Sequence, residues 1–115
     1  MLTLPIKKKW FDMICSGEKR EEYRKITDYY GTRFRNVWGY AAYWGEPHEI
    51  RFRNGYSKNS PSVIATCTLS KKVGRPEWGA EPGKRYFVLT ILSVKQSAHA
   101  GGLNPAPYER GGPDR

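Results

Sequence analysis

The chain has 115 residues, of which 38% are hydrophobic and 14% are aromatic. This length and composition predict one folded domain and exclude a wholly disordered protein. The formal net charge is +9, and residues 1–96, with 18 basic and 9 acidic side chains, carry all of it. A small basic domain favours an anionic partner, nucleic acid before an anionic membrane.

The first two elements in chain order are expected to be a short strand over 2–6 and an amphipathic helix over 7–17. The residues LTLPI have strand character, although Pro5 could instead open a helix. In KKKWFDMICSG the apolar side chains from Trp10 to Ile14 lie within about one turn of helix surface. Gly17 is a suitable C-terminal stop. The lysine run at the N-terminal end, where cations are unfavourable, indicates either solvation or an anionic partner.

The residues after this helix are expected to be extended from Glu21 to Thr27. Glu22 and Arg24 then share one face of a strand, and Glu21 and Tyr23 share the other.

The segment 27–47 is rich in aromatic residues and punctuated by glycine. It is expected to begin with a short helix, capped by Thr27 or Asp28, and to continue as a long ordered loop. The crowded aromatic side chains could stack on bases or cover one end of a barrel, and cover is the favoured role. They are Trp38, Tyr40, Tyr43 and Trp44.

Three further strands are expected over 48–56, 62–73 and 85–96, with a turn-rich connection over 74–84. In the first of them apolar and basic residues alternate, and Asn54-Gly55 is a turn pair. The predicted fold class is α+β: a small curled barrel of about five to six mostly antiparallel strands with one or two short helices.

The remaining segment, 97–115, holds four glycines and three prolines and carries no net charge. This composition predicts a C-terminal tail or linker outside a domain over 1–96.

The two cysteines, Cys15 and Cys67, are expected to be buried thiols rather than a disulfide or a nucleophile. No Cys/His group has metal-ligand spacing, so no metal or other cofactor is expected. The first residues lack the long apolar region typical of a secretory signal, and no apolar run is long enough to span a membrane. We therefore expect a cytoplasmic protein with no membrane partner.

The stretch SGEKREEYRK at 16–25 contains seven charged residues of both signs. Lys19 lies in the turn after the helix, and Glu22 and Arg24 project from one face of the next strand, so all three could converge. The cations could then hold a phosphate or a carbonyl oxygen. The carboxylate could neutralise them, accept a base N–H or act as a general base. The alternative is a solvent-exposed charged edge.

The pattern Gly17-x-Lys19-x-x-Glu22-x-Arg24, after a short helix that follows LPIKKKW, resembles the signature of the ASCH domain family. IRFRNGY at 50–56 and PEWGAEPG at 76–83 also look like segments of small ASCH proteins from bacteria and phages. The resemblance covers roughly residues 2–96. It implies a PUA-like β-barrel and the binding of RNA in a cleft beside the motif.

The same resemblance implies an alternative function. One branch of the family hydrolyses N4-acetylcytidine, and some members are described as ribonucleases. In the amidohydrolase branch a lysine is followed three residues later by a threonine, the proposed nucleophile. Lys19 matches that lysine, but Glu22 occupies the threonine position, so the nucleophile is missing. A carboxylate could still activate water, which makes Lys19 and Glu22 the candidate catalytic residues.

The other candidate contacts to nucleic acid are Arg51, Arg53 and Tyr56. The two arginines share a strand face and the tyrosine follows the turn, so they could form a phosphate-binding ridge with a stacking partner. The alternative is a solvent-facing side of a strand. The predicted function is therefore RNA or nucleotide binding by these residues and by the charged side chains of the motif.

Overall fold

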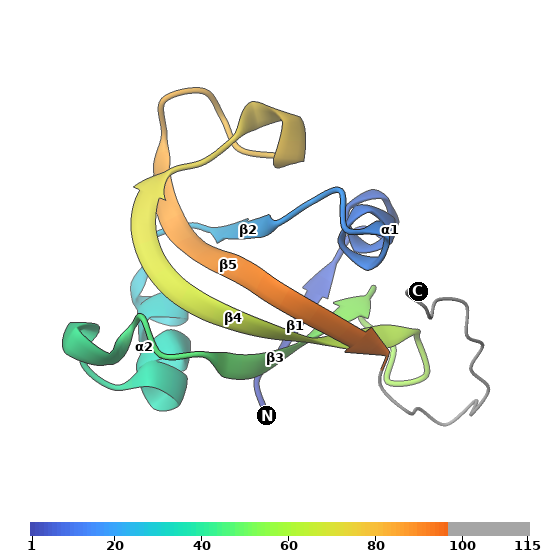
Figure 1. Cartoon of the computed structure of the whole chain (residues 1–115), viewed down its shortest axis with the longest axis horizontal. Coiled ribbons are helices and arrows are strands. Elements are labelled where there is room, and N and C mark those ends of the chain that lie inside the picture. Colours follow the sequence, from blue (N-terminus) through green and yellow to red (C-terminus); the bar gives the residue numbers. More distant parts are fainter. Residues whose placement is uncertain (97–115) are drawn as a thin grey trace.

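The computed structural model describes residues 1–96, so the expected tail over 97–115 lies outside the described residues. Five strands and two α-helices, with two short 3₁₀ turns, follow one another along the chain (Figure 1). Their order is β1 (Thr3–Ile6), α1 (Lys8–Ser16), β2 (Glu21–Arg24), α2 (Asp28–Trp38), a 3₁₀ turn (Ala41–Tyr43), β3 (His48–Asn54), β4 (Ser62–Val73), a 3₁₀ turn (Pro76–Trp78) and β5 (Arg85–Gln96).

The five strands form one sheet in the order β1-β3-β4-β5-β2. β1 pairs with β3 in parallel, and every other neighbouring pair is antiparallel. The sheet curls strongly, as the long arcs of β4 and β5 show (Figure 1). A register shift between Thr66 and Cys67 interrupts the pairing of these two strands. The expected α+β class with a curled, mainly antiparallel sheet is confirmed as a five-stranded half-barrel.

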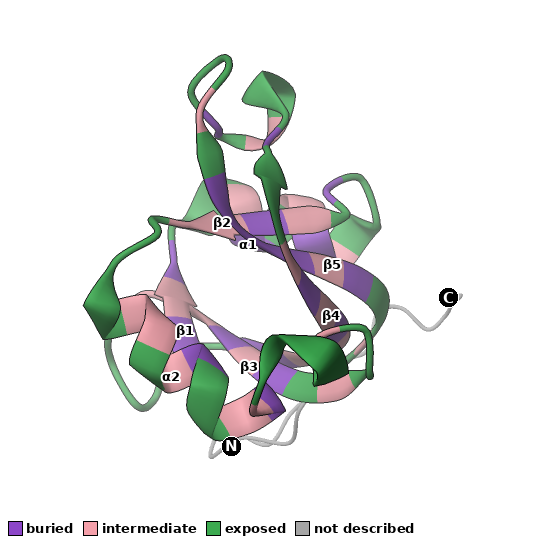
Figure 2. Cartoon of the chain, turned by 90° about the vertical axis from the view of Figure 1, so that its left-hand side faces the viewer, coloured by how far each residue is buried: buried purple, intermediate pink, exposed green. Residues whose placement is uncertain are grey.

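The main hydrophobic core lies on the concave side of this sheet, and Figure 2 shows which parts of the strands and helices are buried. Alternate residues of β1, β3, β4 and β5 supply it, because successive side chains of a strand point to opposite faces. The helices contribute Phe11 and Ile14 from α1, and Phe34 and Trp38 from α2. Both helices therefore pack their apolar faces onto the core. Within residues 1–96 no helix has the length and apolar character needed to cross a bilayer.

α1 ends where the sequence predicts. Gly17 has a φ of 85°, a left-handed conformation that glycine adopts at little cost. Its backbone N–H donates to the carbonyl of Ile14 at 3.1 Å. The chain thereby leaves the helix and turns toward β2, which fixes where Lys19 lies.

α2 is longer than the short helix expected from the sequence, and the long loop prediction is wrong for its residues. Thr27 caps the helix, as predicted, by accepting a hydrogen bond from the N–H of Tyr30 at 3.3 Å. Tyr30, Phe34 and Trp38 recur every four residues and so lie on one helix face. Phe34 packs edge-on against Phe87 with ring centroids 5.2 Å apart. These contacts stabilise a helix whose full length the aromatic, glycine-containing composition does not predict.

One predicted boundary is wrong, because β2 ends at Arg24 rather than at Thr27. β3 ends at Asn54, where the turn pair is predicted, but β4 begins only at Ser62, so a loop rather than a two-residue turn connects them. Gly55 instead donates its N–H to the carbonyl of Ile6 at 3.1 Å, which extends the pairing of β1 with the β3 segment.

Candidate functional site

The motif residues of β2 point into the half-barrel. The register of β2 with β5 places Glu22 opposite Leu89 and Arg24 opposite Phe87. Because Leu89 and Phe87 belong to the main core, Glu22 and Arg24 lie on the concave face. Tyr23 packs on the other face of β2 with a second cluster of Ala80, Tyr86 and Val88.

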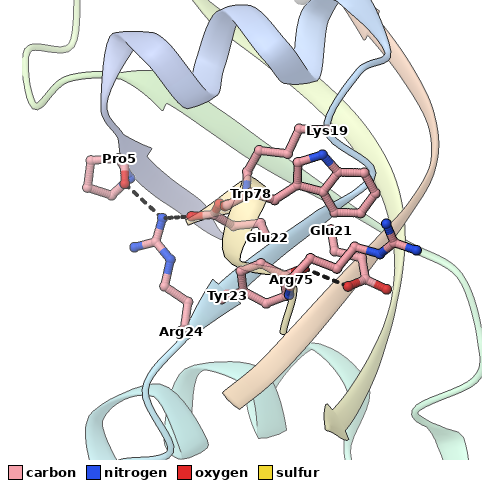
Figure 3. A network of polar contacts seen from close by, with 8 residues as sticks. All are labelled: Pro5, Lys19, Glu21, Glu22, Tyr23, Arg24, Arg75 and Trp78. Carbon is pink, nitrogen blue, oxygen red and sulfur yellow. Dashed lines mark hydrogen bonds and ion pairs between the residues drawn. The ribbon is translucent and has the colours of Figure 1, made fainter. Parts of the chain in front are cut away.

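The structure brings Lys19, Glu22 and Arg24 together around one carboxylate (Figure 3). The Nζ atom of Lys19 lies 3.2 Å from Oε1 of Glu22, and Nη2 of Arg24 donates to Oε2 at 2.8 Å. Lys19 is only 1% exposed and Glu22 7% exposed. A buried carboxylate is costly unless it is paired, and here each of its oxygens has a cationic partner.

The buried ammonium group of Lys19 makes its contacts with groups inside the protein. Its Nζ also donates to the carbonyl of Trp78 in the β4–β5 connection. The ammonium lies 5.1 Å from the ring centroid of Trp10 and 4.9 Å from that of Tyr23. Burial lowers the pKa of Lys19 below its ordinary value, and the nearby Glu22 opposes this shift. Lys19 thus connects the turn after α1 to the β4–β5 connection.

Arg24 connects β2 to two other elements. Its Nη1 donates to the hydroxyl of Tyr30 in α2 at 3.1 Å, and its Nη2 donates to the carbonyl of Pro5 in β1 at 2.9 Å. The Nε atom is buried and has no hydrogen-bond partner within the described part of the chain. One donor of this guanidinium is therefore unsatisfied within the described residues.

A cleft of about 770 Å³ lies between β1 and β2, with walls from α1, the start of the β3–β4 connection and the β4–β5 connection. Its volume falls within the range of about 300–1,000 Å³ typical of small-molecule sites. Four cationic side chains and two carboxylates line it, namely Lys7, Lys8, Arg24, Lys25, Glu22 and Glu81. Five aromatic side chains complete the wall, namely Trp10, Tyr23, Tyr30, Tyr56 and Tyr86.

The residues that line this cleft differ in solvent exposure and in ion pairing. Tyr56 is 89% exposed, so its ring is accessible to a ligand. Lys8 pairs with Asp12 at 2.6 Å. Lys7 and Lys25 are exposed and form no ion pair among residues 1–96. The exposed wall of the cleft therefore offers two uncompensated ammonium groups and one free aromatic ring.

The structure separates the predicted ridge into two parts. Tyr56 lines the cleft, but Arg51 and Arg53 do not belong to its described lining. Ile50 and Phe52 are fully buried on the concave face, so the alternating arginines lie on the other face of β3. A ligand in the cleft would therefore meet Tyr56 without these arginines.

The sequence interpretation did not assign Lys25 or Tyr30 to the site and left the lysine run undecided. The run at the start of α1 was the available signal, because cations are unfavourable at a helix N-terminus and need another explanation. Tyr30 could have been found from its four-residue spacing with Phe34, which predicts a shared helix face.

The aromatic residues over 38–44 fall into a group that packs on the core and a group that is exposed. Trp38 is buried and donates its Nε1–H to the carbonyl of Glu46 at 2.8 Å, and Trp44 packs against the core. These two cover the barrel end, which was the favoured role. Tyr40 and Tyr43 are 79% and 50% exposed and remain accessible.

Both cysteines are thiols, as predicted, but only Cys67 is buried and Cys15 is partly exposed. Burial raises the pKa of Cys67 to about 12, and burial together with Asp12 raises that of Cys15 to about 12. Thiols of this kind are poor nucleophiles at neutral pH. Across residues 1–96, no three His, Cys, Asp or Glu side chains are grouped in a way that could hold a metal ion.

No protein-family model, curated protein or solved structure matches the chain.

Proposed function

We propose that the chain binds RNA or a nucleotide in the cleft between β1 and β2. The observation that carries this proposal is the combination of four cations and five aromatic rings in one cleft. Both lining carboxylates are already compensated: Glu22 by Lys19 and Arg24, and Glu81 by Lys84 at 3.6 Å. Cationic side chains with stacking platforms are the components that single-stranded nucleic acid requires.

The cleft residues divide naturally between backbone and base contacts. The unpaired ammonium groups of Lys7 and Lys25 would contact phosphates, which position a strand without reading its sequence. Tyr56 would stack on a base. Arg24 also lines the cleft, and its buried Nε–H would donate to a phosphate or base oxygen only after the side chain moves.

The alternative, a hydrolase with Lys19 and Glu22 as catalytic groups, fits the geometry less well. The Lys19 ammonium faces the carbonyl of Trp78 and does not belong to the described lining of the cleft. Each oxygen of Glu22 is paired with a cation. A substrate would therefore have to displace Lys19 or Arg24 before Glu22 could activate water. Turnover of N4-acetylcytidine or of single-stranded RNA that disappears in Glu22→Gln would favour the hydrolase.

The resemblance of the motif to the ASCH signature supports the same proposal. In this proposal the half-barrel is PUA-like, the motif lies beside the ligand, and the protein acts on RNA in the cytoplasm.

The test is fluorescence anisotropy with a labelled single-stranded RNA over a series of salt concentrations. Lys7→Gln/Lys25→Gln should weaken binding and lower the salt dependence, by about 0.7 in the slope of log K against log salt for each phosphate that no longer pairs with a lysine. Arg20→Gln/Lys58→Gln removes the same charge from exposed positions outside the described lining and is the matched control. Equal loss of affinity in the two double variants would mean that the cleft is not the binding site.

A further inference from the structure

A second, smaller pocket lies beside the C-terminal half of α2. It has a volume of about 200 Å³, and α2, the 3₁₀ turn that follows it, β4 and β5 form its walls. Figure 2 shows this side of the molecule, with the exposed 3₁₀ turn close to α2. Phe34, Trp44 and Phe87 form its apolar wall, and the exposed Tyr40 also lines it. The pocket shares no lining residue with the cleft between β1 and β2.

Two cations line this pocket and are uncompensated. Arg35 belongs to the last turn of α2, where a cation is favourable for the helix, and Lys71 projects from β4. Neither side chain forms an ion pair in the part of the chain that the structure describes, and no carboxylate belongs to the described lining. The Nζ atom of Lys71 lies 5.3 Å from the ring centroid of Phe87 and 5.8 Å from that of Trp44.

We propose that this pocket binds a small aromatic anion: one ring system that carries a carboxylate or a phosphate. The volume lies below the range of about 300–1,000 Å³ that drug-sized ligands need, so it admits one ring system. The aromatic walls suit a planar ring, which would pack against Trp44 and Tyr40. Arg35 and Lys71 would pair with the anionic group of the ligand.

Two glycines line this pocket. Gly31 is on the pocket side of α2, and a Cβ added there would lie 3.9 Å from Cζ of Phe87. A larger side chain at position 31 would therefore extend into the pocket. Gly39, with a φ of 74°, ends α2 and directs the chain into the 3₁₀ turn next to Tyr40.

The experiment is an amide NMR titration of the full chain with indole-3-acetate and with phenyl phosphate. Indole-3-ethanol supplies a ring without an anion, and acetate supplies an anion without a ring. We expect shifts of the Gly39, Tyr40 and Ala41 amides and of the Trp44 indole N–H. A response to either aromatic anion supports the proposal and identifies the preferred anionic group, and a response to neither overturns it.

Three variants locate the binding. Tyr40→Ala and Arg35→Gln/Lys71→Gln each change exposed side chains and should weaken the binding of the responding anion about fivefold. Gly31→Leu should block the pocket without removing a charge. Lys7→Gln/Lys25→Gln, which alters only the other cleft, should leave these shifts unchanged. Full affinity in both Tyr40→Ala and Arg35→Gln/Lys71→Gln would overturn the proposal, whether or not Gly31→Leu folds.

Discussion

Arg24 of β2 donates a hydrogen bond to the backbone carbonyl of Pro5 of β1 at 2.9 Å, and this contact joins the two edges of the sheet (Figure 3). β3, β4 and β5 separate these strands in the sheet order, so only the curl of the sheet brings them near each other. The same guanidinium lines the cleft. Arg24 therefore has a structural role as well as the proposed role in binding.

Arg24→Ala should destabilise the fold by about 3 kcal/mol. The change removes hydrogen bonds to Pro5, Tyr30 and Glu22 and leaves Glu22 with Lys19 as its cationic partner. Removal of one partner from a buried ion pair costs about 3–5 kcal/mol. Urea denaturation, followed by circular dichroism, measures the difference in the free energy of unfolding.

Two further variants serve as controls: one keeps the charge at position 24 without the shape of arginine, and the other removes a neighbouring charge. Arg24→Lys keeps the charge but not the planar fork, so it should recover only part of the stability that Arg24→Ala removes. Lys25→Ala removes an exposed cation one residue away and should leave stability almost unchanged. If Arg24→Ala is as stable as Lys25→Ala, Arg24 does not close the half-barrel.

Lys19 should make the free energy of unfolding depend on pH in the alkaline range. Burial lowers its pKa in the folded protein below the ordinary value of 10.5, so between these two values the unfolded chain binds more protons than the folded chain. The free energy of unfolding should therefore rise with pH through this window, relative to a variant that lacks the ammonium. Lys19→Met is that variant, and urea denaturation of both proteins from neutral pH toward 10.5 measures the difference.

The comparison with Lys19→Met also cancels the contribution of other titrating groups to the pH dependence of stability. Burial raises the pKa of Tyr23, but both proteins contain this tyrosine, so its effect largely cancels in the difference. A difference in unfolding free energy that stays constant with pH would show that the folded protein does not lower the pKa of Lys19.

Local sequence signals predicted much of the fold. The alternating and β-branched runs located β4 and β5 at their observed bounds, and Gly17 located the end of α1. The parallel pairing of β1 with β3 and the sheet order depend on contacts between distant segments, which no local pattern specifies. α2 was underestimated because its helical signal lies in the spacing of aromatic residues rather than in its composition.

The candidate site was predicted only in part, because local patterns reveal some of its residues and contacts between distant segments supply the rest. The alternation along β2 placed Glu22 and Arg24 on one face, and the turn brought Lys19 beside them. The carbonyls of Trp78 and Pro5, which occupy donors of Lys19 and Arg24, come from distant segments and had no local signal.

Tyr56 should contribute more to RNA binding than Arg51 and Arg53 together. Tyr56 is accessible in the cleft, whereas the arginines lie on the other face of β3. Loss of base stacking costs about 1–3 kcal/mol, so Tyr56→Ala should weaken binding about fivefold or more. Anisotropy titrations of Tyr56→Ala and of Arg51→Gln/Arg53→Gln, at the same salt concentration, measure both effects. A larger loss in the arginine variant would place the RNA on the outer face of the sheet.

Gly74 should be intolerant of even a single added methyl group. A Cβ at this position would lie 2.6 Å from Cβ of Ala80 and 2.8 Å from Cε1 of Tyr23. Tyr23 is held in place because its hydroxyl donates to Glu21 at 2.7 Å and accepts from the N–H of Arg75 at 2.9 Å. The clash would displace this ring from its contact with Lys19, so Gly74→Ala should cost about 2 kcal/mol.

Gly45→Ala is the matched control for this substitution. A Cβ at Gly45 would have no neighbour within 4 Å, and like Gly74 it does not have a positive φ. The two variants therefore differ in crowding rather than in the need for a left-handed backbone. Thermal and urea unfolding should show a clear loss for Gly74→Ala and little change for Gly45→Ala. Equal stabilities would mean that Ala80 and Tyr23 both move aside freely and that Tyr23 does not fix the position of the Lys19 ammonium.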